Sequence, residues 1–220
     1  MKKLVIFDLD GTLFNTTEAM KTCGNEALQR LGLPLLEGAD YASFSGAGVE
    51  EYVNSILDKV GDREHHNARL FWEYYTSKNE AEQTELIFPY DGIKELLFDL
   101  KERGIRLAVL SNKNENACIP IIKEKFGEGI FDLVRGERKN TPPKPDPTGA
   151  LETMEFFSAL PEECLYVGDT QVDMLTGKNA KIPTVAVLWG YRTKEVLSQY
   201  SPEFFAEKPE DILHLIEESK

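Results

Sequence analysis

The stretch "LVIFDLDGTLF", residues 4–14, decides the fold. It begins with four apolar residues, as expected of a strand that is buried on both faces of a sheet. It then places two carboxylates, Asp8 and Asp10, where the apolar run ends. Aspartate is almost never buried unless it is paired or binds a metal. Because residues two apart in an extended strand point the same way, we expect both acids to face one site.

Further β-prone apolar runs follow along the chain, with helical patterns between them. The runs cover residues 4–9, 106–110, 131–134, 164–167, 183–188 and, more weakly, 204–206. The clearest helical pattern covers 91–104, with Asp91 as its expected N-cap and Gly104 as its stop. Weaker helical patterns cover 169–180, 192–200 and 209–219. This alternation predicts an α/β fold with a doubly wound, Rossmann-like parallel sheet, whose ligands bind at the carboxyl ends of the strands.

One connection is too long for a simple crossover between strands. The segment between Phe14 and Pro89 reads as helical throughout, and a loop of that length inside a compact domain is improbable unless it has its own fold. We therefore expect residues 15–85 to form an inserted helical cap domain. Residues 1–14 together with 86–220 would form the α/β core domain.

Composition limits the possible partners and compartment. The 220 residues carry a formal net charge of -13, which disfavours nucleic acid and anionic membrane surfaces. The apolar run Leu4–Phe7 is too short for an export signal, and no run has the length of a membrane span. The cysteines are scattered and odd in number, as expected of reduced thiols in the cytoplasm: Cys23, Cys118 and Cys164.

Acidic and small polar residues recur where the predicted strands end. They are Asp8, Asp10, Gly11 and Thr12 after the first run, Ser111, Asn112 and Lys113 after the second, and Gly168, Asp169, Thr170 and Asp173 after the run 164–167. The loop "PPKPDP" (142–147) adds Lys144. Each feature alone is typical of turns and helix caps. Together, in a parallel sheet, they are predicted to converge on one edge.

A cluster of four carboxylates requires cations. Like charges about 4 Å apart repel by roughly 4 kcal/mol at an effective dielectric of 20, and Asp8, Asp10, Asp169 and Asp173 are expected to crowd together. Lys144 supplies one positive charge. Because the cluster contains no His or Cys, a hard divalent ion with oxygen ligands, Mg²⁺, fits better than Zn²⁺.

Four motifs resemble those of the haloacid dehalogenase (HAD) superfamily, in the same order and at similar spacing. They are "DLDGT" (8–12), "LSN" (110–112), "KPDP" (144–147) and "GDTQVD" (168–173). The long insertion resembles the helical cap of the phosphoglycolate phosphatase-like branch, and "WGYR" (189–192) is similar to a segment common there. In one departure, Lys181 stands where relatives often have glycine.

The resemblance implies a Mg²⁺-dependent phosphatase that acts on a small phosphorylated metabolite through an aspartyl-phosphate intermediate. By this likeness, Asp8 is the nucleophile and Asp10 the general acid and base. The implied metal ligands are Asp8, Asp10 through its backbone carbonyl, and Asp169, with Asp173 in a supporting role. The implied phosphate-binding residues are Gly11, Thr12, Ser111, Asn112 and Lys144, and Thr12 would also orient Asp10.

Several alternatives remain open at this stage. Asp10 argues against a dehalogenase, because releasing a halide needs no proton. A phosphomutase similar to β-phosphoglucomutase would keep every core motif. A phospho-aspartate receiver, or an inactive binding relative, would not turn over substrate. Likeness to the branch suggests phosphoglycolate as substrate. The loop "SGAGVE" (45–50) either reaches toward that substrate or only connects two helices. We expect a monomer or a dimer.

Overall fold

The computed structural model describes residues 2–77 and 84–218, and the chain divides into two compact units. The core unit comprises Met1–Phe14 and Pro89–Lys220, and the inserted unit comprises Asn15–Phe88. The chain passes from one unit to the other at two places, within the short strands β2 (Phe14–Asn15) and β3 (Phe88–Pro89). The inserted unit thus ends at Phe88, three residues beyond residue 85, where the sequence predicted its end.

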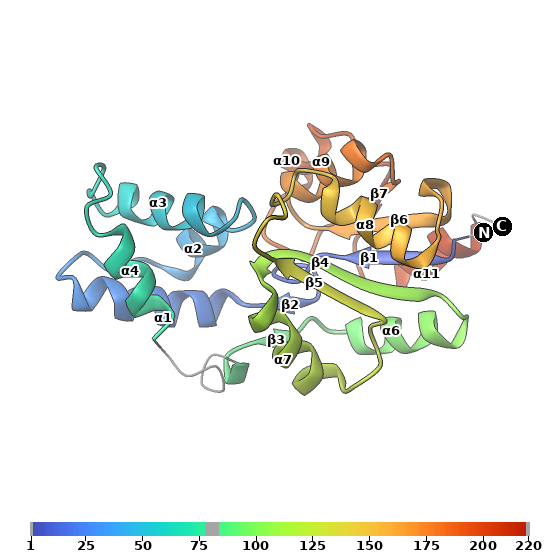
Figure 1. The fold of residues 1–220 in the computed structure, drawn as a ribbon, viewed down its shortest axis with the longest axis horizontal. Coiled ribbons are helices and arrows are strands. Elements are labelled where there is room, and N and C mark those ends of the chain that lie inside the picture. The colour runs from blue at the N-terminus through green and yellow to red at the C-terminus, as the bar shows by residue number, and fades with distance from the viewer. Residues whose placement is uncertain (1, 78–83, 219–220) are drawn as a thin grey trace. The chain divides into compact units, whose positions relative to one another are not determined.

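The core unit is built on a six-stranded sheet in the order β5-β4-β1-β6-β7-β8, and each adjacent pair is parallel. The strands are β1 (Leu4–Phe7), β4 (Arg106–Asn114), β5 (Leu133–Glu137), β6 (Cys164–Gly168), β7 (Thr184–Val187) and β8 (Phe204–Ala206). Helices lie on both sides of this sheet (Figure 1). The predicted α/β fold with a doubly wound parallel sheet is confirmed.

Strand β1 lies at the centre because its four side chains are all apolar and fully buried. Burying each such side chain stabilises the fold by roughly 1.5–3 kcal/mol. From β1 the chain builds β4 and β5 on one side, and it then returns to build β6, β7 and β8 on the other. The strand order therefore switches direction at β1, which makes the carboxyl end of β1 the expected ligand position.

Helices α6 (Ile93–Glu102) and α7 (Glu115–Phe126) lie on one side of the sheet in Figure 1. Helices α8 (Thr148–Phe157), α9 (Gln171–Ala180) and α10 (Lys194–Ser198) lie on the other, and α11 (Glu210–Glu218) packs against α6. A 3-10 turn, η1 (Pro161–Glu163), precedes β6. No helix within the described ranges is long and apolar enough to cross a bilayer.

Three local predictions for the core need correction. Strand β4 continues through Ser111, Asn112 and Lys113 to Asn114, whereas the predicted run ended at residue 110. The N-cap of α6 is Gly92, whose φ of 82° suits glycine, and not Asp91. Strand β5 begins at Leu133 and extends to Glu137, whereas the predicted run covered residues 131–134. The Asp132 carboxylate explains that start, because it accepts hydrogen bonds from Leu107 N (2.9 Å) and from the Lys101 ammonium (3.0 Å).

Asp132 is a local anchor between this loop and β4. Besides those two donors, the Arg106 guanidinium donates to its carboxylate at 2.9 Å. Burial by itself would raise the pKa of Asp132, but the hydrogen bonds and the neighbouring positive charges hold the pKa below its ordinary value. The ionised carboxylate therefore stabilises the folded state.

Lys181 is explained by the end of α9. It is the C-cap residue of that helix and lies in the left-handed region at φ 61°, with its N–H directed to Lys178 O at 3.1 Å. Glycine is the usual residue in this conformation, since a Cβ atom makes it unfavourable by about 1–2 kcal/mol. The departure from the relatives therefore affects a turn and not a side chain of the candidate site.

The inserted unit is helical, with α1 (Thr17–Arg30), α2 (Gly38–Phe44), α3 (Val49–Lys59) and α4 (Ala68–Tyr75). Gly24 allows α1 and α2 to approach closely, because a Cβ atom there would lie 2.2 Å from the Tyr41 ring. Tyr41 is fully buried and donates to Asn25 Oδ1 at 2.8 Å. Within the segment 15–85, which was predicted to be helical, residues 78–83 lie outside the described residues.

Candidate active site

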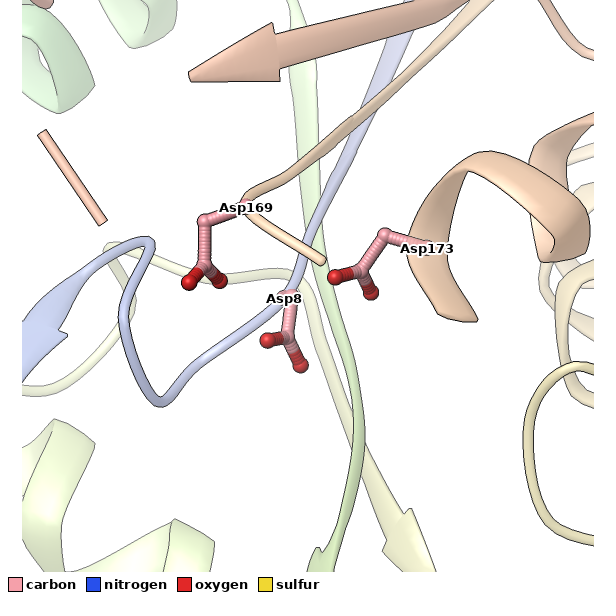
Figure 2. Close-up of side chains that lie close together, drawn as sticks. All are labelled: Asp8, Asp169 and Asp173. Atoms are coloured by element: carbon pink, nitrogen blue, oxygen red, sulfur yellow. The ribbon is translucent and has the colours of Figure 1, made fainter. Parts of the chain in front are cut away.

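Three buried carboxylates converge at the switch point of the sheet. Asp8 follows β1, Asp169 follows β6 and Asp173 lies in the first turn of α9. Each offers an oxygen within 4.8 Å of the others. Figure 2 shows the three carboxylates close together. The predicted convergence of strand-end acids therefore holds for these three residues.

Lys144 supplies the positive charge that the sequence assigned to this cluster. Its ammonium donates to Asp8 Oδ1 and to Asp173 Oδ1, both at 2.7 Å, and its side chain is only 4% exposed. The Asn112 side chain holds the lysine backbone from both sides: Nδ2 donates to Lys144 O (3.0 Å), and Oδ1 accepts from Lys144 N (2.8 Å). The Asn112 side chain therefore positions Lys144.

The pKa values in this cluster are set by burial and by the presence of three acids and one lysine. Burial, followed by the charge of Asp173, raises the pKa of Asp8 to about 7, although the Lys144 ammonium opposes that rise. Burial and the charges of Asp173 and Asp8 also raise the pKa of Asp169 well above its ordinary range. Burial alone would lower the pKa of Lys144, but Asp173 and Asp8 raise it, so the ammonium stays charged.

Asp173 is held in place by the start of its own helix. Thr170 is the N-cap of α9, and Asp173 Oδ2 accepts hydrogen bonds from Thr170 N (3.0 Å) and Thr170 Oγ1 (2.6 Å). Gly168 makes room for this arrangement, because a Cβ atom there would lie 2.2 Å from Asp173 Cβ. Asp173 thus uses one oxygen to cap the helix and the other to bind Lys144.

Asp169 is enclosed by residues from the turn after β1 and from the segment after β7. Its Oδ1 accepts from the Thr12 hydroxyl at 3.0 Å, and its Oδ2 accepts from Tyr191 N at 2.8 Å. The resemblance assigned Thr12 to Asp10, so this contact with Asp169 departs from that expectation. A Cβ atom at Gly11 would lie 2.3 Å from Asp169 Oδ2, and one at Gly190 would lie 2.2 Å from Asp169 Cβ.

Residues 189–191 are the part of this enclosure to which sequence reasoning assigned no role. Gly190 also lies close to the backbone of Gly11, since a Cβ atom added at Gly190 would lie 2.5 Å from Gly11 O. Trp189 Nε1 donates to Thr12 O at 3.0 Å. The motif "WGYR" was the available signal, and the structure shows that it joins the segment after β7 to the turn after β1.

Asp10 departs from the expected four-acid cluster. Its carboxylate lies outside the group of three acids and instead pairs with the Lys113 ammonium, at 3.3 Å from Oδ1 and 3.2 Å from Oδ2. Lys113 stands next to the predicted Ser111 and Asn112 in the sequence, but no role had been assigned to it. Ser111 is buried beside it, and its Oγ accepts from Lys113 N at 3.1 Å.

The donor set suits a hard divalent cation. All three clustered side chains are carboxylates, which are the ligand class that Mg²⁺ prefers. They are buried, and Lys144 offsets one of their three negative charges when all are ionised. Buried charges need pairing or a metal, so the residues present fit a bound divalent ion.

Comparisons with known proteins agree with this geometry. The family model described as "Haloacid dehalogenase-like hydrolase" matches residues 5–187. The chain is 33% identical over 215 residues to a phosphoglycolate phosphatase of Aquifex aeolicus, covering 98% of this chain and 97% of that protein. It is 30% identical over 218 residues to the pyrophosphatase PpaX of Listeria monocytogenes, with the same coverage of each.

A solved structure shares the whole fold. The crystal structure of "a predicted phosphoglycolate phosphatase" from Haemophilus somnus matches with a TM-score of 0.86 and 27% identity, covering 98% of each chain. All four motifs lie within the residues that the family model matches. The chain therefore belongs to the family of haloacid dehalogenase-like hydrolases.

Proposed function

We propose that this chain is a Mg²⁺-dependent phosphatase that hydrolyses a small-molecule phosphate monoester through a phosphorylated Asp8. The observation that carries the proposal is the position of the Asp8 carboxylate. It lies at the end of the central strand, 2.7 Å from the Lys144 ammonium and beside two further buried acids. Relatives named phosphatases that match almost the full length of the chain support the same reaction class.

The metal would be held by the side chains of Asp8 and Asp169 and by the backbone carbonyl of Asp10, with Asp173 in support. When bound, Mg²⁺ neutralises negative charge on the phosphoryl group and on its acidic surroundings. Gly11 and Gly190 leave the space that the Asp169 carboxylate needs beside the turn after β1. Thr12 and the Tyr191 N–H fix both oxygens of that carboxylate before any ligand binds.

Asp8 acts as the nucleophile in this proposal. One of its oxygens attacks phosphorus, the bond from phosphorus to the leaving oxygen breaks with its electron pair, and Asp10 donates a proton to that oxygen. In the second step Asp10 takes a proton from water, whose oxygen attacks phosphorus and releases Asp8 and inorganic phosphate. Lys144 orients Asp8 and, with Gly11, Thr12, Ser111 and Asn112, binds the phosphoryl oxygens. Splitting the reaction into two steps is the usual advantage of covalent catalysis.

The substrate is proposed to be a small phosphorylated metabolite, with phosphoglycolate the first candidate. The Aquifex relative carries that name, and the net charge of -13 disfavours polyanionic macromolecules as partners. We further propose that the inserted unit acts as the cap domain, with residues 45–50 contributing to specificity. A cytoplasmic location and a monomeric or dimeric state complete the proposal.

The test is phosphate release from an aryl phosphate, followed by a panel of phosphorylated metabolites ranked by kcat/KM. We expect turnover only with Mg²⁺, and loss of turnover in Asp8→Asn, which changes one carboxylate to an amide of the same shape. The matched control is Asp91→Asn, the same change at an exposed position on the approach to α6. Turnover in Asp8→Asn at the rate of the control would overturn the proposal, as would a wild-type protein without activity in Mg²⁺.

A further inference from the structure

Lys113 lies at the candidate site but has no role in the chemistry proposed above. It belongs to the irregular carboxyl end of β4, where the register to β5 shifts between Leu110 and Asn114. Its side chain is 25% exposed, and its ammonium lies within 3.3 Å of both carboxylate oxygens of Asp10. This ammonium is therefore both accessible and adjacent to the expected general acid.

The backbone of Lys113 is fixed by close packing. A Cβ atom on Gly136 in β5 would lie 2.4 Å from Lys113 O, so the two strands approach each other there without an intervening side chain. Lys113 N donates to Ser111 Oγ at 3.1 Å, and the thiol of the buried Cys118 lies 3.6 Å from Lys113 O. The side chain therefore starts from a rigid position, as expected of a group that binds a ligand selectively.

Lys113 also differs from Lys144 in what it can offer a ligand. The Lys144 ammonium is 4% exposed and is bound to Asp8 and Asp173 on the inner side of the cluster. In a chain with 38 acidic and 25 basic residues, a partly exposed ammonium beside the site locally opposes the repulsion of anions. Lys113 is thus suited to bind a part of the substrate that extends away from Asp8.

We propose that Lys113 binds a second anionic group on the leaving side of the substrate. The substrate class is then a phosphate ester or anhydride whose leaving group carries a negative charge close to the oxygen that departs. This inference rests on the proposed function, because it uses Asp10 as the acid that meets the leaving oxygen.

The distances allow this contact. An acid that protonates the leaving oxygen lies about 2.6–3.2 Å from it, and Lys113 Nζ lies 3.2 Å from Asp10 Oδ2. The ammonium is therefore no more than about 6.4 Å from the leaving oxygen. A carboxylate attached through one carbon has oxygens roughly 3 Å from that leaving oxygen, and a hydrogen bond of about 2.9 Å covers the remainder.

The names of the relatives are consistent with this substrate class. Phosphoglycolate carries a carboxylate one carbon from the leaving oxygen, and in pyrophosphate the leaving group is itself a phosphate. The two relatives named for these compounds match this chain at 33% and 30% identity. A neutral alcohol or phenol as leaving group offers nothing for Lys113 to bind.

The test compares kcat/KM for phosphoglycolate and pyrophosphate with kcat/KM for p-nitrophenyl phosphate, whose leaving group has no second anion. We expect the wild type to prefer at least one of the anionic substrates. In Lys113→Met, that preference should fall by about 10- to 100-fold, the usual range for losing a hydrogen bond to a charged group. Lys113→Arg should restore part of the preference, and the control Lys94→Met, on the exposed face of α6, should retain all of it.

Each other outcome has a defined meaning. An equal fall for all three substrates in Lys113→Met would show that Lys113 acts only through Asp10, and it would overturn this inference while leaving the phosphatase intact. A wild type that hydrolyses p-nitrophenyl phosphate without preferring either anionic substrate would overturn it too. A wild type that hydrolyses none of the three in Mg²⁺ would overturn the proposed function itself.

A second measurement does not depend on how the variants fold. If Lys113 attracts a second anion from a partly exposed position, added salt should weaken the wild-type preference, because salt screens exposed charges. A preference for the anionic substrates that stays constant as the salt concentration rises would contradict a direct role for Lys113.

Discussion

The Asp8 carboxylate should destabilise the metal-free protein at neutral and alkaline pH. Its folded pKa of about 7 lies above its ordinary value of 3.8, mainly because the group is buried and faces Asp173. The folded state therefore binds more protons than the unfolded state between these two values, and stability falls as pH rises through them. One pKa unit is worth about 1.36 kcal/mol, so the cost above the folded pKa approaches roughly 4 kcal/mol.

Replacing Asp8 with Asn removes this cost, because Asn is neutral at every pH and has nearly the same shape. In EDTA at about pH 8, we expect Asp8→Asn to be more stable than the wild type by up to roughly 4 kcal/mol. A change of that size raises Tm by about 8–16 °C in a chain of this length. At about pH 4 the advantage should disappear, because the wild-type carboxyl is then protonated in the folded state.

The assay is thermal and urea unfolding across this pH range, with Asp91→Asn as the control for an exposed acid. The fluorescence of Trp189, in a Trp72→Phe background, reports on the core unit alone, because Trp72 lies in α4 of the inserted unit. Wild type and Asp8→Asn with parallel pH profiles would refute the reasoning. So would a wild type that is the more stable of the two at about pH 8 without metal.

Further predictions concern the metal, the enclosure of Asp169 and the loop before β5. Mg²⁺ at one hundred times its Kd should stabilise the folded protein by about 2.7 kcal/mol and raise Tm by roughly 5–11 °C, and Asp169→Asn should lose most of that gain in differential scanning calorimetry. Gly190→Ala places a Cβ atom 2.2 Å from Asp169 Cβ and 2.5 Å from Gly11 O, and displacing those groups should lower kcat by about 10²-fold in steady-state kinetics while the circular dichroism spectrum stays folded. Asp132→Asn should lose roughly 1–3 kcal/mol of unfolding free energy in urea at neutral pH. Because the folded pKa of Asp132 lies below its ordinary value, that loss should shrink as pH falls through the folded pKa.

The sheet could be predicted from the sequence because each of its strands contains a short apolar run that is visible without tertiary information. Four consecutive apolar residues followed by acids predict β1 without reference to the rest of the chain. The polar residues at the end of β4 and after β6 follow the same rule. Once the strands are parallel, their ends must share an edge, and that is why Asp8, Asp169 and Lys144 could be assigned to one site.

The contacts that could not be predicted depend on backbone approach between distant segments. Gly190 matters because the segment after β7 passes within contact distance of Asp169 and Gly11 O, a closeness that no local pattern records. Lys113 reaches Asp10 because the end of β4 is irregular beside Gly136. The sequence gives no sign of this irregularity, so it gave no reason to pair Lys113 with Asp10.

The central claim is that Asp8 becomes phosphorylated during turnover, and mass spectrometry of the trapped enzyme tests it most directly. Enzyme incubated with substrate and Mg²⁺, quenched in acid and digested, should carry one phosphoryl group on the peptide that contains Asp8. Asp10→Asn should retain that group for longer, because the water that hydrolyses the intermediate then lacks its base. A phosphoryl group on another residue, or continued turnover by Asp8→Asn, would contradict the account.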